Sequence, residues 1–256
     1  MHPRQICVTL TLLLLTSSPK PAFAEYTQAI QELFQSDTVY PQGQGEIQFT
    51  LLPSYAKGDG FSQQAVPVIL EYGITNRFQI QAEWLGYARH SFSDPSTPSV
   101  SGIGDLELGF RYSWMEIAQS YFHAAFGVDF NLPIGDESKG LSEGHFGATP
   151  AVVIAADMDR TKGTQFMAQF GADIEEGHVS TKDAEWFMNF AILVPFQRTT
   201  LTAEWNVTEE QQFLTPGLIW QPKKNLEIGI GAPIGLNDDA DDYRIVFMLT
   251  LEFDTD

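Results

Sequence analysis

The chain has very little cysteine, few basic residues and no long apolar run outside its first residues. Its one cysteine, Cys7, stands near the start, so a disulfide framework is excluded. It has 14 Lys and Arg against 33 Asp and Glu, a formal net charge of −19, which would repel a phosphate backbone and argues against nucleic acid as a partner. Beyond residue 24, no stretch approaches 18 continuous apolar residues, so the sequence predicts no membrane-spanning helix.

The sequence also lacks a recognisable catalytic or metal-binding pattern. Its five histidines are scattered and show no ligand spacing such as H-x-x-x-H, so we predict no metal site and no cofactor. His123 is the one expected to face inward on a strand, yet no serine stands at a matching level on a neighbouring strand. We therefore predict no catalytic residues and no enzyme, with a membrane hydrolase as the weakest alternative.

The first 24 residues have the features of a secretory signal peptide. Arg4 gives a basic start, residues 6–16 form a short apolar run, and residues 22–24 read Ala-Phe-Ala, a small-residue cleavage site. We expect a mature chain that begins at Glu25. Loss of Arg4 and Lys20 would leave 12 basic residues against 33 acidic ones.

Apolar and polar residues alternate along most of the remaining chain. The clearest example is residues 104–114, in which an apolar set alternates with a polar or small set: Leu106, Leu108, Phe110, Tyr112 and Trp114 against Asp105, Glu107, Gly109, Arg111 and Ser113. Because successive strand side chains point to opposite faces, such a strand has one apolar and one polar face. A tilted strand of about ten residues is long enough to cross a bilayer.

This alternation recurs twelve times, with turns between the copies. The predicted strands are residues 45–56, 63–74, 78–89, 102–114, 121–132, 145–157, 164–175, 184–196, 199–207, 211–221, 225–235 and 242–253. Short connections alternate with longer ones rich in Gly, Ser, Pro and acid, as in outer-membrane barrels. We predict an all-β fold over residues 43–256, a transmembrane antiparallel up-and-down β-barrel of about 12 strands. A secreted β-sandwich is the alternative, but its polar faces would carry many lysines.

Aromatic residues collect near both ends of the predicted strands, which is typical of the two membrane interfaces. The expected periplasmic set is Tyr72, Phe78, Trp114, Phe122, Phe166, Phe196, Trp220 and Phe253. The expected outer set is Tyr55, Trp84, Tyr87, Phe130, Phe146, Trp186, Trp205 and Tyr243. Lipid of a Gram-negative outer membrane is therefore the predicted surroundings of the barrel.

Residues 25–42 precede the first predicted strand. Ala29, Ile30, Leu33 and Phe34 have a helical spacing, which allows a short amphipathic helix. Two interpretations stay open: a periplasmic lead-in, or a small plug that folds into the lumen.

If the apolar faces meet lipid, the polar faces line the lumen. The candidate permeation residues are Glu71, Glu83, Asp105, Glu107, Arg111, His123, Asp129, Glu204, Glu227 and Arg244. Twelve strands lie between the filled and the wide barrels, so a narrow, acid-lined pore that favours cations or neutral polar solutes is the first interpretation. The alternative is a closed structural or surface-interaction barrel, with arginine–acid pairs inside and acidic outer loops. We expect Asp105, Glu107, Arg111 and His123 to share one half of the barrel.

Three segments together resemble a known family. Residues 70–78 read LEYGITNRF, residues 102–112 read GIGDLELGFRY, and residues 130–136 read FNLPIGD. This series resembles the MetA-pathway of phenol degradation family of outer-membrane transporters. The resemblance implies a signal-bearing barrel, uptake of small solutes including aromatic or hydrophobic compounds, and no catalytic residues. Residues 254–256 follow Phe253, a departure from the terminal aromatic that the barrel-assembly machinery, the expected folding partner, commonly reads.

Overall fold

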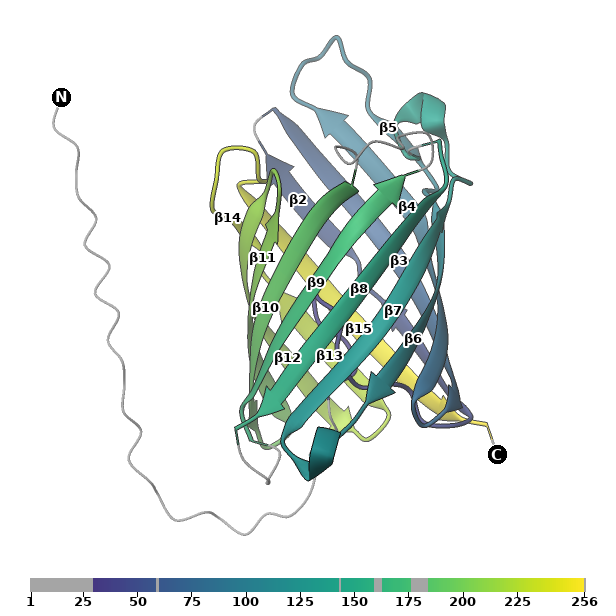
Figure 1. Ribbon diagram of the computed structural model, residues 1–256. Helices are drawn as coiled ribbons and strands as arrows, with labels where there is room; N and C mark the ends of the chain where they lie inside the picture. The colour runs from purple at the N-terminus through teal and green to yellow at the C-terminus, as the bar shows by residue number, and fades with distance from the viewer. Residues whose placement is uncertain (1–29, 59, 143, 159–162, 176–183, 256) are drawn as a thin grey trace, which may run out of the picture.

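The computed structural model describes residues 30–58, 60–142, 144–158, 163–175 and 184–255. The predicted signal peptide and its cleavage point lie outside these residues. The described strands form one closed antiparallel β-barrel (Figure 1). No helix among them is long and apolar enough to cross a membrane.

Fifteen strand segments form the twelve strands of the barrel. Three of the twelve strands are each interrupted once and consist of two consecutive segments that pair with the same neighbouring strand. They are β1 (Glu46–Leu51) followed by β2 (Ser54–Gly58), β5 (Val100–Gly102) followed by β6 (Leu106–Trp114), and β13 (Leu226–Gly231) followed by β14 (Ile234–Gly235). The other nine are β3 (Phe61–Thr75), β4 (Phe78–Phe92), β7 (Phe122–Leu132), β8 (Gly147–Asp157), β9 (Gln165–Glu175), β10 (Ala184–Phe196), β11 (Thr199–Thr208), β12 (Gln212–Lys223) and β15 (Tyr243–Asp254). Two short 3₁₀ turns, η1 (Ile117–Gln119) and η2 (Glu137–Lys139), lie in connections.

The barrel closes where its first and last strands pair. In β1 and β15, Phe49 lies opposite Leu251 and Thr50 opposite Thr250, and the two threonine hydroxyls are hydrogen-bonded at 2.9 Å. Closure leaves no open sheet edge, which is the condition for crossing a bilayer with strands. The predicted strand order, strand number and barrel class are confirmed.

The two rims of the barrel differ. Connections of two residues join β3 to β4, β10 to β11 and β12 to β13 at the rim where the C-terminus lies (Figure 1). The longer connections, such as residues 133–146, lie at the opposite rim. By the usual asymmetry of these barrels, the short-turn rim faces the periplasm and the long-loop rim faces outward.

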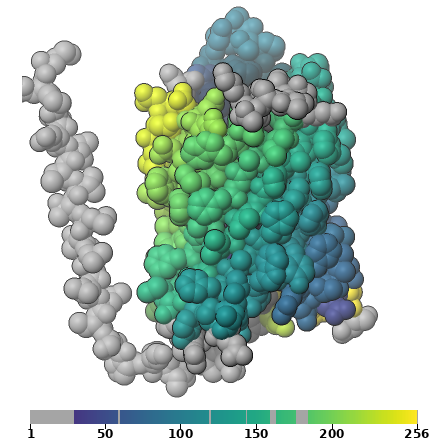
Figure 2. Space-filling view, in the orientation of Figure 1, coloured from purple at the N-terminus to yellow at the C-terminus, as the bar shows by residue number. Residues whose placement is uncertain are grey.

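Figure 2 shows one face of the barrel wall, and large apolar side chains are exposed along the described strands. Side chains such as Leu70, Leu201 and Phe247 are half exposed, although they lie in the middle of strands. Large exposed apolar surfaces of this kind indicate contact with lipid. Fourteen of the sixteen residues predicted for the two aromatic girdles are exposed, and Phe78 and Phe130 are partly buried.

The interior of the barrel is polar on its walls and contains a separate piece of chain. Residues 30–42, the inner segment, have no helix, so the helix expected there is absent from its described part. The segment lies inside the barrel and leads at Gly45 into β1. Its path decides what the lumen can do.

Candidate functional site

The inner segment buries its apolar side chains against the lumen wall. Leu33, Phe34 and Val39 are 2%, 6% and 0% exposed, and they belong to one cluster with wall residues such as Ile219 and Met248. Each contact removes apolar surface from water in a lumen whose walls are otherwise mostly polar. The segment therefore fills the half of the lumen that adjoins the periplasmic rim.

Phe34 lies in a cradle of three glycines. A Cβ atom at Gly217 of β12 would lie 2.4 Å from the Phe34 ring, and one at Gly229 or Gly231 of β13 would lie 3.0 or 2.6 Å from it. Real Cβ contacts are essentially never shorter than 3.0 Å, so any larger residue at Gly217 or Gly231 would displace the ring. Glycine in a strand often marks such a close approach. The sequence contained this signal, although nothing in it identified Phe34 as the occupant.

Glu204 of β11 holds the backbone of the segment. Its fully buried carboxylate accepts hydrogen bonds from the backbone N–H groups of Phe34 and Gln35, both at 3.0 Å, and from Ser36 Oγ at 2.8 Å. Three donors aimed at one carboxylate are a strong, charge-assisted arrangement. Glu204, a candidate permeation residue, is thus a binding residue for the segment.

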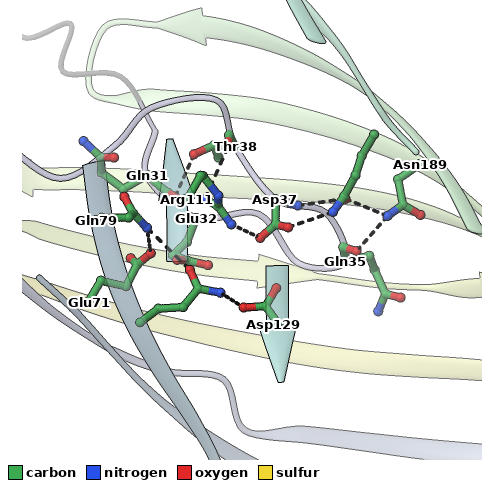
Figure 3. A network of polar contacts seen from close by, with 12 residues as sticks. Gln31, Glu32, Gln35, Asp37, Thr38, Glu71, Gln79, Arg111, Asp129 and Asn189 are labelled. Carbon is green, nitrogen blue, oxygen red and sulfur yellow. Dashed lines mark hydrogen bonds and ion pairs between the residues drawn. The ribbon is translucent and has the colours of Figure 1, made fainter. Parts of the chain in front are cut away.

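Asp37 links the segment to the opposite wall (Figure 3). Its carboxylate pairs with the guanidinium of Arg111 on β6 and accepts a hydrogen bond from Gln169 Nε2 of β9 at 2.7 Å. Arg111 also donates to the Thr38 carbonyl at 3.3 Å. The charge of buried Arg111 is therefore compensated by the segment, which no local feature of the sequence indicated.

Glu71 of β3 lies where the segment leaves the lumen. It accepts hydrogen bonds from the side-chain amides of Gln42, Gln48 and Gln79 at 3.1, 2.6 and 2.5 Å. Close by, a Cβ atom at Gly73 would lie 1.9 Å from the Gly43 carbonyl oxygen, so the chain passes directly over β3 there. The exit of the segment is tightly packed.

His123 is engaged at both ring nitrogens. Nε2 lies 3.0 Å from Asp157 Oδ2, and Nδ1 accepts a hydrogen bond from the Glu116 backbone N–H at 3.0 Å. The proton of the neutral ring is therefore assigned to Nε2. Neither nitrogen is left to activate a nucleophile, so this geometry fits a structural histidine.

Tyr40 extends the same group of contacts into the segment. Gln165 Nε2 donates to the Tyr40 hydroxyl and to Asp157 Oδ1, both at 2.5 Å. Burial raises the pKa of Tyr40 to about 12, so its hydroxyl stays protonated at neutral pH. The segment is thus fastened near the periplasmic rim as well as at mid-lumen.

The outward half of the lumen is a cavity of about 710 Å³, the outer vestibule. Six acidic residues line it: Glu83, Asp105, Glu107, Asp173, Glu175 and Glu185. Among the described residues of its lining there is no lysine or arginine, and Leu85 and Leu141 add apolar surface. Glu83 and Glu107 lie directly opposite one another on β4 and β6. Like charges in register repel, so this region favours cations.

A connection at the outer rim packs over part of the vestibule. Asp105 accepts a hydrogen bond from the Gly135 backbone N–H at 2.9 Å, and Leu141 is buried beside Gly102 and Gly135. Two of the segments that carry the family resemblance, residues 102–112 and 130–136, therefore meet in space. Asp105 holds a loop as well as lining the cavity.

The structure divides the candidate residues between the two halves of the lumen. Glu71, Arg111, His123, Glu204 and Glu227 are buried in the inner half, whereas Glu83, Asp105 and Glu107 line the outer vestibule. Asp129 accepts a hydrogen bond from Gln81 at 2.6 Å, and Arg244 pairs with Asp241 at 2.8 Å. Asp105, Glu107, Arg111 and His123 were expected in one half of the barrel because they belong to adjacent strands, and β6 and β7 are indeed paired. Their depths differ, because six residues of extended strand already span about 20 Å.

Fold and sequence together identify the class of protein as an outer-membrane β-barrel. The family model described as "Putative MetA-pathway of phenol degradation" matches residues 47–250, and the chain belongs to this family. A comparison with curated proteins finds no match.

Solved structures with the same fold include two named membrane proteins. An outer membrane channel from Pseudomonas putida F1 is 13% identical, with a TM-score of 0.63 over 84% of this chain and 98% of that one. The KdgM porin is 10% identical, with a TM-score of 0.54 over 80% of this chain and 99% of that one. At such identities the likeness establishes the fold alone.

Proposed function

We propose that this protein is an outer-membrane channel for small solutes, closed in the present conformation by its inner segment. The observation that carries this proposal is the division of the lumen. An acidic cavity of about 710 Å³ lies in the outward half, and its inward continuation is filled by a separate piece of chain. A small barrel without a transport role can fill its lumen with wall side chains alone. Here the filling is a segment that is tethered at Gly45 and can leave without unfolding the wall.

The vestibule lining supports a class of solute. Carboxylates of Glu107, Glu175 and Glu185 attract cations and repel anions, while Leu85 and Leu141 offer apolar contact. A small cation, or a neutral polar compound with an apolar body, fits this combination. The family description, which refers to phenol degradation, supports aromatic compounds within that class.

The second candidate function is a permanently closed structural barrel. The observation in its favour is the number of hydrogen bonds that hold the inner segment, including three to Glu204 alone. In this alternative, the segment is part of the core, and the acidic outer rim binds a partner.

One experiment separates the two functions. The signal-free protein and a variant lacking residues 30–42 are refolded, checked by the heat-dependent shift in electrophoretic mobility, and recorded in planar bilayers under a salt gradient. We expect the variant to show larger, cation-selective current steps than the full-length protein, because its inward path is cleared. A folded variant that stays silent would contradict the channel proposal and favour the structural barrel.

A further inference from the structure

Two carboxyl groups meet where the inner segment lies against the wall. Glu32 belongs to the segment, and Glu71 of β3 is 3% exposed (Figure 3). Gln48 Nε2 donates to both carboxyl groups, at 3.2 Å to Glu32 and 2.6 Å to Glu71, so the two groups lie next to one another, where a hydrogen bond can join them. A hydrogen bond between two carboxyl groups needs a proton on one of them. The contact between segment and wall therefore depends on one titratable proton.

The hydrogen bonds around the pair assign that proton to Glu32. Glu71 accepts from three side-chain amides, those of Gln42, Gln48 and Gln79, and such donors favour the charged form of a carboxyl group. Glu32 accepts a longer hydrogen bond from Gln48, at 3.2 Å. Glu71 is accordingly the carboxylate, and Glu32 is the acid that donates to it.

The surroundings offer no spare positive charge for a second carboxylate. Arg111 of β6 and Asp37 of the segment, which are paired with one another, both act on the pair electrostatically, and the acidic groups of Asp129 on β7 and Glu83 on β4 act on Glu71. The residues of β1 and β4 that donate hydrogen bonds to Glu71, Gln48 and Gln79, are uncharged. Arg111 is already paired with Asp37. Ionised Glu32 would add a fourth acidic group around a single guanidinium, after Asp37, Glu71 and Asp129.

Burial and charge act on Glu32 in the same direction. Desolvation raises the pKa of the Glu32 carboxyl well above its usual range, and the negative charges of Glu71 and Asp37 raise it further against the opposing effect of Arg111. The pKa of Glu32 is raised only while the segment is seated. Protonation therefore stabilises the seated state at lower pH, and this stabilisation is lost as the pH rises through the raised value.

We propose that Glu32 and Glu71 form a proton-dependent latch, in which one shared proton holds the inner segment in the lumen and its loss releases the segment. The inference rests on the proposed channel function and adds the condition under which the channel opens. Release removes Glu32 from Glu71 and returns its carboxylate to water, while Glu71 keeps Gln48 and Gln79 as donors from the wall.

The first test is the pH dependence of the channel current. Because one proton is released per opening, the open probability of the full-length protein should rise with pH by at most about tenfold per pH unit. In Glu32→Gln, the amide still donates to Glu71 but cannot ionise, so the channel should stay closed at alkaline pH. Glu209→Gln, which removes an exposed carboxyl group between β11 and β12, should respond to pH as the unmodified protein does.

The variant lacking residues 30–42 separates failure of the latch from failure of the channel. Suppose that the shortened variant conducts at every pH. If the current of the full-length protein then does not change with pH, or if Glu32→Gln responds to pH as the full-length protein does, the latch is overturned and the channel stands. If that variant is silent at every pH, the channel proposal fails together with the latch.

A second readout follows the segment itself. Gln35→Cys introduces a single thiol into the signal-free chain, whose sequence then has no other cysteine. Its maleimide labelling rate is divided, at each pH, by the rate of the Gln35→Cys, Glu32→Gln double variant, which cancels the intrinsic pH dependence of the thiol. We expect this ratio to rise with pH. A constant ratio would overturn the latch even if bilayer recordings were silent.

Discussion

The inner and outer halves of the lumen are built by the same alternation of strand residues, yet they differ in what meets their polar side chains. In the inner half, Glu71, Arg111 and Glu204 bind atoms of a peptide segment. In the outer half, Glu83 and Glu107 lie side by side on neighbouring strands and line an open cavity. An inward-facing charged residue is therefore not by itself a permeation residue. Its role depends on whether protein or solvent stands opposite it.

Among the substitutions that test this difference between the two halves, we expect the largest effect on stability from removing Arg111. Arg111→Met removes the cation between Asp37 and Glu71, and loss of one partner of a buried charge pair costs about 3–5 kcal/mol. The free energy of unfolding from denaturant titration in detergent or lipid measures this. Arg77→Met, at an exposed turn, should stay within about 0.5 kcal/mol of the unmodified protein. Equal effects of both variants would refute the importance of the pairing.

A smaller effect is expected at the glycine cradle. Gly231→Ala places a methyl group 2.6 Å from the Phe34 ring, and overpacking of this kind costs about 1–3 kcal/mol. Because the segment can yield more easily than the wall, we expect larger channel currents with the barrel still folded.

Two further variants make this prediction sharper. Gly86→Ala, whose new methyl group would lie 3.5 Å from Val68, should leave the current unchanged. Adding Phe34→Ala to Gly231→Ala should remove the overlap, so that the two substitutions are not additive. If the effects of Gly231→Ala and Phe34→Ala on the current were additive, this would count against direct contact between the ring and the methyl group.

The smallest effect on stability is expected in the outer vestibule. Glu83→Gln with Glu107→Gln removes two like charges in register, so stability should change by less than about 0.5 kcal/mol while cation preference falls. Reversal potentials under a salt gradient, in the variant that lacks residues 30–42, report that preference. Asp105 is left intact because it holds the Gly135 backbone. Glu116→Gln, at the periplasmic rim, is the matched control, and an equal shift there would contradict a selective vestibule.

The barrel wall was predictable because its signal is local. The two-residue alternation shows which face of each strand is apolar, and the turn residues show where each strand ends. Both are present in residues 104–114 without reference to any other part of the chain. The family resemblance, carried by residues 70–78, 102–112 and 130–136, was confirmed by the family match.

The occupant of the lumen was not predictable in the same way. Phe34 and Glu204 are 170 residues apart in the sequence, and Asp37 and Arg111 are 74 apart. The inner segment has no regular secondary structure, so no periodicity shows which of its residues face the wall. Alternation indicates the face on which Arg111 lies, but not its depth in the barrel or its partner. For that reason the sequence could propose residues for the lumen side of the wall, but it could not assign each of them to the filled or the open half.

The attachment at Gly45 has a consequence for how the proposed channel would close. Gly45 donates a backbone hydrogen bond to Gly73 at 2.8 Å and accepts one from Thr255 at 2.9 Å. The segment is therefore attached at the place where the first and last strands pair and close the barrel. A released segment stays within a few residues of its binding site, at an effective concentration on the order of millimolar or higher. Reclosure is then an intramolecular event that needs no partner or energy source. A solute in the inner half would compete with the tethered segment for the same wall residues, and each opening would last only until the segment binds again.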